Sequence, residues 1–307
     1  MIPEDVLNLM TRVSQSGLTP LHQLSIKKAR QEFERRNLVL ELEPEYVAKT
    51  QDIVLTPNNL RTRFYWSSDC TYEGFVLYVH GGGWVLGSID GYDRLCRRLA
   101  NRVRLPIASI DYSLAPENPF PKPISDVMAA ANAHKEIAEL ANVTGHTWTI
   151  MGDSAGANLA AAAVLNLPYE SRPNHQALVY PVIDLSYQTR SRTSYRSGYL
   201  LDEPLMNWFT DHYLSGADLW NPHASLIYNT SLKESPPTLI VTADLDPLHD
   251  EGVMYAKALR YSQVKVDHYN CRSLIHGFLN MPKALPRSST VTGRICRWLR
   301  NTMTSEC

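Results

Sequence analysis

The stretch that decides the fold is TWTIMGDSAGANLAAAAVL, residues 147–165. Its first five residues form an apolar run with strand propensity, and the alanine-rich run 158–165 favours a helix. Between them lies the pentapeptide GDSAG, whose glycines at 152 and 156 leave room for a sharp turn from strand into helix. Such a turn exposes the Oγ of Ser154 at the top of a sheet. The pattern therefore predicts a nucleophile elbow rather than an ordinary turn.

A second glycine-rich motif, His80-Gly81-Gly82-Gly83-Trp84, directly follows the apolar strand pattern at 75–79. Consecutive glycines let a backbone approach a ligand closely and turn its N–H groups outward. Fixed N–H donors stabilise the charge that builds on oxygen when a carbonyl is attacked, and losing one raises the barrier by about 2.7–4 kcal/mol. We expect an oxyanion hole formed by the N–H groups of Gly82, Gly83 and Ala155. The alternatives are a plain connection or a phosphate loop, but the lysine and hydroxyl residue that a phosphate loop needs do not follow these glycines.

A candidate acid and a candidate base follow the serine in the order Ser, acid, His. A strand pattern at 238–243 ends in DLDPLHD, residues 244–250, and His276 comes 30 positions after Asp246. An imidazole near neutral pH suits the removal of a hydroxyl proton, and a buried carboxylate orients it. We choose Asp246 as that carboxylate. Spacing alone leaves two alternatives, since Asp244 could cap the strand and Asp250 could favour the start of a helix.

At this point the chain resembles the hormone-sensitive-lipase-like branch of the α/β-hydrolases, particularly the bacterial acetyl esterases. In that family the Asp of the Asp-Pro-Leu motif is the triad acid, which favours Asp246 as the partner of His276 and Ser154. One position departs from the pattern: members usually place Gly three residues before the histidine, where this chain has Ser273. The resemblance covers roughly residues 75 to 280 and rests on HGGGW (80–84), DYSLAPE (111–117), GDSAG (152–156), DPL (246–248), HGF (276–278) and, more weakly, WFTDHYL (208–214).

The remaining chain is consistent with one α/β domain over residues 1–307. At 44% hydrophobic it can bury a single large core, and strand patterns alternate with helical ones, as a mostly parallel sheet flanked by helices requires. The core-facing pattern recurs at 124–131 and 291–299. We assign the core to 46–184 and 233–307. The segments 1–45 and 185–232 carry apolar faces (residues 6, 9, 10 and 13, then 205, 208, 209 and 213), and the resemblance implies that they pair as a helical cap. The alternative is that both are surface helices packed on the core.

The composition of the chain limits which classes of partner we expect it to bind. Lys plus Arg is 30 and Asp plus Glu is 31, which gives no electrostatic case for nucleic acid. No signal peptide or 18-residue apolar stretch is present, so we expect no membrane contact. Five cysteines without pairing spacings predict reduced thiols and a cytoplasmic protein, with no metal and no cofactor. We expect a monomer or a homodimer.

Together these features predict a serine carboxylesterase that hydrolyses short acyl esters of the acetyl type. The resemblance, not the spacing, implies the short acyl chain. Two other classes stay open: a ligand receptor on the same fold, which the presence of Ser154, Asp246 and His276 disfavours, and a regulatory module that binds another protein. A peptidase is a further alternative, which the three-glycine motif disfavours.

Overall fold

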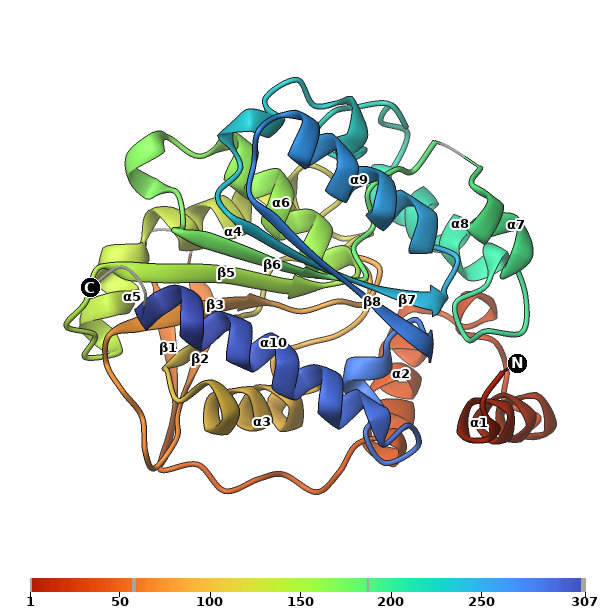
Figure 1. Ribbon diagram of the computed structural model, residues 1–307. Helices are drawn as coiled ribbons and strands as arrows, with labels where there is room; N and C mark the ends of the chain where they lie inside the picture. The colour runs from red at the N-terminus through yellow and green to blue at the C-terminus, as the bar shows by residue number, and fades with distance from the viewer. Residues whose placement is uncertain (1, 57–58, 187, 305–307) are drawn as a thin grey trace.

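The computed structural model describes residues 2–56, 59–186 and 188–304, and its centre is one sheet in the order β1-β2-β4-β3-β5-β6-β7-β8 (Figure 1). β2 pairs with β1 on one side and with β4 on the other, and both pairings are antiparallel. The remaining pairs, along β4-β3-β5-β6-β7-β8, are all parallel. The mostly parallel sheet confirms the predicted α/β-hydrolase architecture. The strands are β1 (Lys49–Leu55), β2 (Leu60–Trp66), β3 (Gly74–Val79), β4 (Ile107–Ile110), β5 (Thr147–Asp153), β6 (His175–Val179), β7 (Thr238–Leu245) and β8 (Val266–Ile275).

Burial explains why the inner strands read as continuous apolar runs. Every residue of β3, β4 and β6 is buried, because helices cover both faces of a parallel sheet. The edge strand β1 has mostly exposed residues and ends its pairing at Leu55. The central strands therefore form a rigid base whose carboxyl ends can hold a site.

Helices form a layer on each face of the sheet (Figure 1). One layer contains α4 (Lys122–Asn132), α5 (His134–Leu140), α6 (Ala155–Asn166) and α9 (His249–Tyr261); the other contains α3 (Asp93–Val103) and α10 (Arg287–Thr304). Each layer has its own apolar cluster, with Val127 and Leu159 in the first and Leu99 and Ile295 in the second. The predicted core-facing patterns at 124–131 and 291–299 thus fall on α4 and α10, although Trp298 is only half-buried.

The two segments outside this core contribute α1 (Glu4–Gln15), α2 (Ile26–Leu40), α7 (Arg190–Ser194) and α8 (Glu203–Leu214). Short 3-10 turns lie at Leu21–Gln23, Tyr169–Ser171, Leu226–Tyr228, Leu232–Glu234 and Phe278–Asn280. The turn at Leu21–Gln23 contacts α8, so the two segments meet although they are far apart in sequence. The apolar face expected on the first helix is shorter than predicted: Val6 and Leu9 are buried, but Val13 is 41% exposed. α1 buries Val6 and Leu9 and contacts β8, whereas its last residues, 11–15, are all exposed, Val13 among them.

Candidate active site

The turn between β5 and α6 holds Ser154 in a strained backbone conformation. Its φ of 55° and ψ of −121° are unusual for a residue with a side chain, and such strain persists only where the surroundings impose it. A Cβ on Gly152 would lie 2.5 Å from the carbonyl of Gly156, and one on Gly156 would lie 2.1 Å from the carbonyl oxygen of Val79. Glycine is therefore required on both sides of the serine, as the pentapeptide predicts.

Three side chains from three different strand ends form one hydrogen-bonded row. The Ser154 Oγ lies 2.9 Å from Nε2 of His276, and Nδ1 of His276 lies 2.8 Å from Oδ2 of Asp246. Asp246 is fully buried, its second oxygen accepts the N–H of Leu248 at 2.8 Å, and the His276 ring lies against Tyr180 at 4.7 Å. In this order the imidazole can take the serine proton while the carboxylate holds its tautomer.

The other two candidate carboxylates point elsewhere. Asp244 accepts a short hydrogen bond from the N–H of Ser273. Asp250, in the first turn of α9, accepts from the N–H of Ser191 at 2.9 Å and contacts His249. Of the three acids in residues 244–250, the structure thus brings only Asp246 to His276.

The loop that follows β3 passes close to the nucleophile turn, since a Cβ on Gly81 would lie 2.9 Å from the carbonyl oxygen of Asp153. Among the described residues, no carbonyl accepts the N–H groups of Gly82, Gly83 or Ala155. A Cβ on Gly83 would lie 2.2 Å from the ring of Phe209 on α8, so only glycine fits beneath that ring. Trp84 stacks on Tyr213 of the same helix at 4.2 Å between ring centroids. The loop is therefore held from one side by α8 and has N–H groups available for a ligand.

Asp153 holds the same loop by a hydrogen bond, and the sequence motifs did not predict this role. Its carboxylate accepts the Tyr78 hydroxyl at 2.7 Å and the N–H of Gly81 at 2.9 Å. Burial raises the pKa of Asp153 even though both donors favour its charged form. The available signal was a charged residue at the end of a buried strand. The two groups that donate to the Asp153 carboxylate lie more than 70 positions away in sequence, so no local pattern reveals them.

The His80 ring packs beside the glycine loop and is not a member of the hydrogen-bonded row of three side chains. Its ring packs on Tyr112 at 4.4 Å and Tyr92 at 5.3 Å, its Nδ1 donates to the carbonyl of Gly81, and Tyr112 donates to the carbonyl of His80. Burial lowers the pKa of His80, which favours a neutral ring. A neutral, enclosed imidazole is suited to shaping the loop.

Ser273, where the family pattern has glycine, adopts a left-handed backbone with φ of 61°. A register shift in the β7–β8 pairing between Ala243 and Leu245 accompanies it. Its N–H donates to Asp244 and its carbonyl accepts from Arg287 at 3.2 Å. The His276 loop thus keeps a conformation that favours glycine, and two charged partners hold a serine in it.

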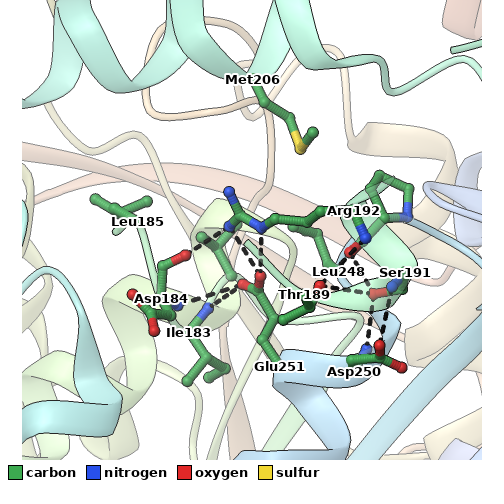
Figure 2. A network of polar contacts seen from close by, with 12 residues as sticks. Ile183, Asp184, Leu185, Thr189, Ser191, Arg192, Met206, Leu248, Asp250 and Glu251 are labelled. Carbon is green, nitrogen blue, oxygen red and sulfur yellow. Dashed lines mark hydrogen bonds and ion pairs between the residues drawn. The ribbon is translucent and has the colours of Figure 1, made fainter. Parts of the chain in front are cut away.

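A polar network ties α7 to the first turn of α9, next to the loop that carries Asp246 (Figure 2). Ser191 Oγ donates to the carbonyl of Pro247 at 2.8 Å and accepts the N–H of Asp250 at 3.1 Å. The Arg192 guanidinium pairs with Glu251 at 2.8 Å, and Glu251 also accepts the N–H of Ile183 at 2.8 Å. Both ion-pair partners are nearly buried, with 11% and 2% side-chain exposure. Ile183, Ser191 and Arg192 are thereby fixed to the base of the site.

Among the described residues, no group of three or more His, Cys, Asp or Glu side chains is arranged to hold a metal ion. Within the same residues, none of the helices combines the length and apolarity needed to cross a bilayer. Four cysteines are free thiols, and three of them (Cys96, Cys271 and Cys296) are buried, while Cys307 lies outside the described residues.

Comparison with known proteins adds a family to this geometry. A family model described as alpha/beta hydrolase fold matches residues 76–280. The chain is 32% identical to an ethyl acetate hydrolase of Pseudomonas putida over 278 residues, 87% of each chain, and 32% identical to an arylesterase of Saccharolobus solfataricus, covering 82% and 84% of the two chains. In structure it is similar to a hyperthermophilic esterase from Pyrobaculum calidifontis, with a TM-score of 0.91, 31% identity and 98% of both chains covered.

Proposed function

Because the chain belongs to the hormone-sensitive-lipase-like family of α/β-hydrolases and is a carboxylic ester hydrolase, we propose that it uses Ser154 as its nucleophile on short acyl esters. The observation that carries the proposal is the continuous row from Ser154 Oγ through His276 to Asp246, with 2.9 Å and 2.8 Å separations. A hydroxyl becomes a competent nucleophile when a base in hydrogen-bond reach can take its proton.

In the first half of the reaction, Ser154 Oγ attacks the ester carbonyl carbon while its proton moves to Nε2 of His276. Asp246 stabilises the imidazolium that forms. The negative charge on the former carbonyl oxygen is met by the N–H groups of Gly82, Gly83 and Ala155. The tetrahedral adduct collapses, His276 returns the proton to the leaving alcohol, and the acyl group stays on Ser154.

In the second half, His276 takes a proton from a water molecule that attacks the acyl carbon. The second adduct collapses to release the carboxylic acid and restore the Ser154 hydroxyl. Each half uses the same oxyanion donors, so their fixed position matters twice in every turnover.

A short acyl group is supported by two observations. One relative is named for ethyl acetate, and the ring of Phe209 lies directly over Gly83, where it limits the room beside the oxyanion loop. Each added methylene gains about 0.8 kcal/mol until the chain meets a wall. Beyond that point it must displace packed side chains at about 1–3 kcal/mol. We therefore expect kcat/KM for p-nitrophenyl esters to be highest from acetate to butyrate and to fall sharply by octanoate.

The test of the mechanism is Ser154→Ala together with covalent labelling. We expect kcat to fall by several decades, on the order of 10⁶ where a triad serine is removed, with the urea midpoint retained. An organophosphate should modify Ser154 and no other residue, as mapped by peptide mass spectrometry. Near-normal turnover of the alanine variant, or a label elsewhere, would refute the assignment. A ligand receptor would bind esters and show no turnover even in the unaltered chain.

A further inference from the structure

The loop after β3 folds back on itself, so that its return half, residues 85–88, lies against its glycine half, residues 81–83. The N–H of Leu86 donates to the carbonyl of Gly82 at 2.8 Å. A Cβ on Gly82 would lie 2.1 Å from the carbonyl oxygen of Leu86. Because glycine has no side chain, the two backbones meet directly at this point. A shift of the return half is therefore passed to the glycine half, which carries two of the expected oxyanion donors.

The turn between the two halves has a backbone conformation that needs support from outside the loop. Trp84, at this turn, has a φ of 62° although it carries a Cβ. The left-handed region disfavours residues with a side chain, and they remain there only where the surroundings impose it. Contacts from other elements therefore help to set where the oxyanion donors lie.

Two side chains of α2 make such contacts with the return half. Arg30 Nε donates to the carbonyl of Val85 at 2.9 Å. The Ser88 hydroxyl donates to Oε1 of Glu34 at 2.7 Å. Arg30 and Glu34 are four residues apart, so they lie on the same face of the helix. α2 thus holds the return half at both of its ends.

Both contacts continue into further hydrogen bonds of the loop. The Ser88 Oγ that donates to α2 also accepts the N–H of Gly91 at 3.0 Å. Arg30 donates to the carbonyl of Ala115 at 3.0 Å, and the N–H of Ala115 donates to the carbonyl of Trp84 at 2.9 Å. The guanidinium is therefore connected to the turn of the loop as well as to its return half.

α2 is itself fixed to the core and can serve as a rigid support. Ala29 is fully buried, and Phe33 packs against both apolar clusters. At the end of the helix, the carbonyl of Leu40 accepts the N–H of Lys283 at 3.1 Å. The side chains that reach the loop thus extend from a helix that is packed before and after them.

We propose that Arg30 and Glu34 are positioning residues for the oxyanion hole. They hold the return half of the loop, and through it the N–H groups of Gly82 and Gly83. The inference rests on the proposed function, because an oxyanion hole matters only if Ser154 attacks a carbonyl. Oxyanion donors act in the transition state, so a loss of positioning should lower kcat and leave KM unchanged.

The test combines steady-state kinetics on p-nitrophenyl acetate with inhibition by an alkyl trifluoromethyl ketone. Ser154 Oγ adds to the ketone carbon, its proton passes to Nε2 of His276, and the ketone oxygen becomes an anion in the oxyanion hole. The inhibition constant therefore reports how well the oxyanion is held. It does not depend on the fraction of folded enzyme, so it separates positioning from stability.

Glu34→Met removes the acceptor of the Ser88 hydroxyl and keeps a long side chain of high helix propensity. We expect kcat to fall and the inhibition constant to rise, each by roughly tenfold, because a misplacement of about 1 Å can cost on the order of 10²-fold. Glu34→Gln keeps an oxygen acceptor and should retain most of the activity. The matched control is Glu32→Gln, whose carboxylate pairs with Arg35 and Arg36 of the same helix and should change neither constant.

A double-mutant cycle tests whether Glu34 acts through Ser88. If it does, the variant that combines Glu34→Met with Ser88→Ala should lose no more than Ser88→Ala alone, because the two changes break one contact. Losses that multiply would overturn this route. Arg30→Met should lower kcat and weaken inhibition in the same way, since it frees the other end of the return half.

A purely structural role for the contact would give a different result. The proposal is overturned if Glu34→Met lowers the urea midpoint but leaves the inhibition constant and the kcat per organophosphate-titrated site unchanged. Equal losses in Glu34→Gln and Glu34→Met would also overturn it. Failure of the proposed function is distinguishable, because the unaltered chain would then bind the trifluoromethyl ketone no more tightly than the matching methyl ketone. That result would remove the proposed function and this inference together.

Discussion

At the scale of single residues, the candidate site depends on backbone positions as much as on side-chain chemistry. Ser154 has a φ of 55° and Ser273 a φ of 61°, both in the region where glycine is usual. The GDSAG motif predicts the conformation of Ser154, because its flanking glycines indicate a sharp turn. It does not predict the second, because the residues that hold Ser273, Asp244 and Arg287, are separated from it by 29 and 14 positions and carry no local signal.

The three acids between 244 and 250 should differ sharply when altered. We expect Asp246→Asn to lower kcat by about 10⁴, because an amide favours the wrong tautomer of His276. Asp250→Asn and Asp244→Asn should lower it far less, since neither carboxylate contacts His276. Steady-state kinetics on p-nitrophenyl acetate measures all three. If Asp250→Asn proved the most damaging, the assignment of the acid would be wrong.

Ser273→Gly should stabilise the chain. A residue with a Cβ costs roughly 1–2 kcal/mol in the left-handed region, and glycine avoids this cost while losing more chain entropy on folding. We expect a net gain of about 1 kcal/mol in the free energy of unfolding, measured by urea denaturation. The control is Ser273→Ala, which keeps the strain and should give no gain. A loss of stability in the glycine variant would contradict the strain argument.

At the scale of elements, sequence patterns predicted individual strands better than the contacts between elements. The strands at 75–79, 147–151 and 238–243 were expected and correspond to β3, β5 and β7. β8 continues to Ile275, because its pairing with β7 resumes beyond the register shift. The attachment of α7 to α9 could not be read from local patterns, since Arg192 and Glu251 are 59 positions apart.

Breaking that attachment should destabilise the chain in a pH-dependent way. Arg192→Met leaves Glu251 as an uncompensated buried charge, which typically costs about 3–5 kcal/mol. Burial already raises the pKa of Glu251, and removing Arg192 takes away its main charged partner. A carboxyl whose pKa is raised on folding contributes stability at low pH that is lost as pH rises through the folded-state pKa. The free energy of unfolding of the variant should therefore lie closer to that of the unaltered chain as pH is lowered toward 4.5, the pKa of an ordinary Glu.

Urea denaturation of both chains over a pH series checks this. The matched control is Arg172→Met, which breaks the more exposed Arg172–Glu234 pair. It should lose much less stability and show no recovery at low pH. A loss in Arg192→Met that is the same at every pH would indicate that Glu251 is not charged in the folded chain.

At the scale of the whole molecule, the N-terminal segment is joined to the regions around the oxyanion loop. Arg30 on α2 donates to the carbonyls of Val85 at 2.9 Å and Ala115 at 3.0 Å, and it pairs with Glu117. The sequence predicted one domain with a cap made of residues 1–45 and 185–232. The contact between the turn at Leu21–Gln23 and α8 is consistent with that pairing, and the cap role remains a prediction.

Deleting residues 1–40 tests the cap. We expect the ratio of kcat/KM for butyrate and octanoate esters to move toward one, because the truncated site loses a wall against long chains, and activity should weaken. The ratio is insensitive to the fraction of folded enzyme, so it separates selectivity from stability. Arg30→Met, which cuts the α2 contacts without removing the segment, should move the ratio less. An unchanged ratio after truncation would refute the cap.

The burial of α1 also sets an order of events during synthesis. Val6 and Leu9 belong to the same apolar cluster as Leu274, and Arg287 pairs with Asp5 across 282 positions. During synthesis α1 is therefore made long before β8 and α10, the elements that supply these partners. Contacts between such distant residues form slowly, because a long loop must close first. Until those elements emerge, the apolar side of α1 stays uncovered, a kind of surface that chaperones bind.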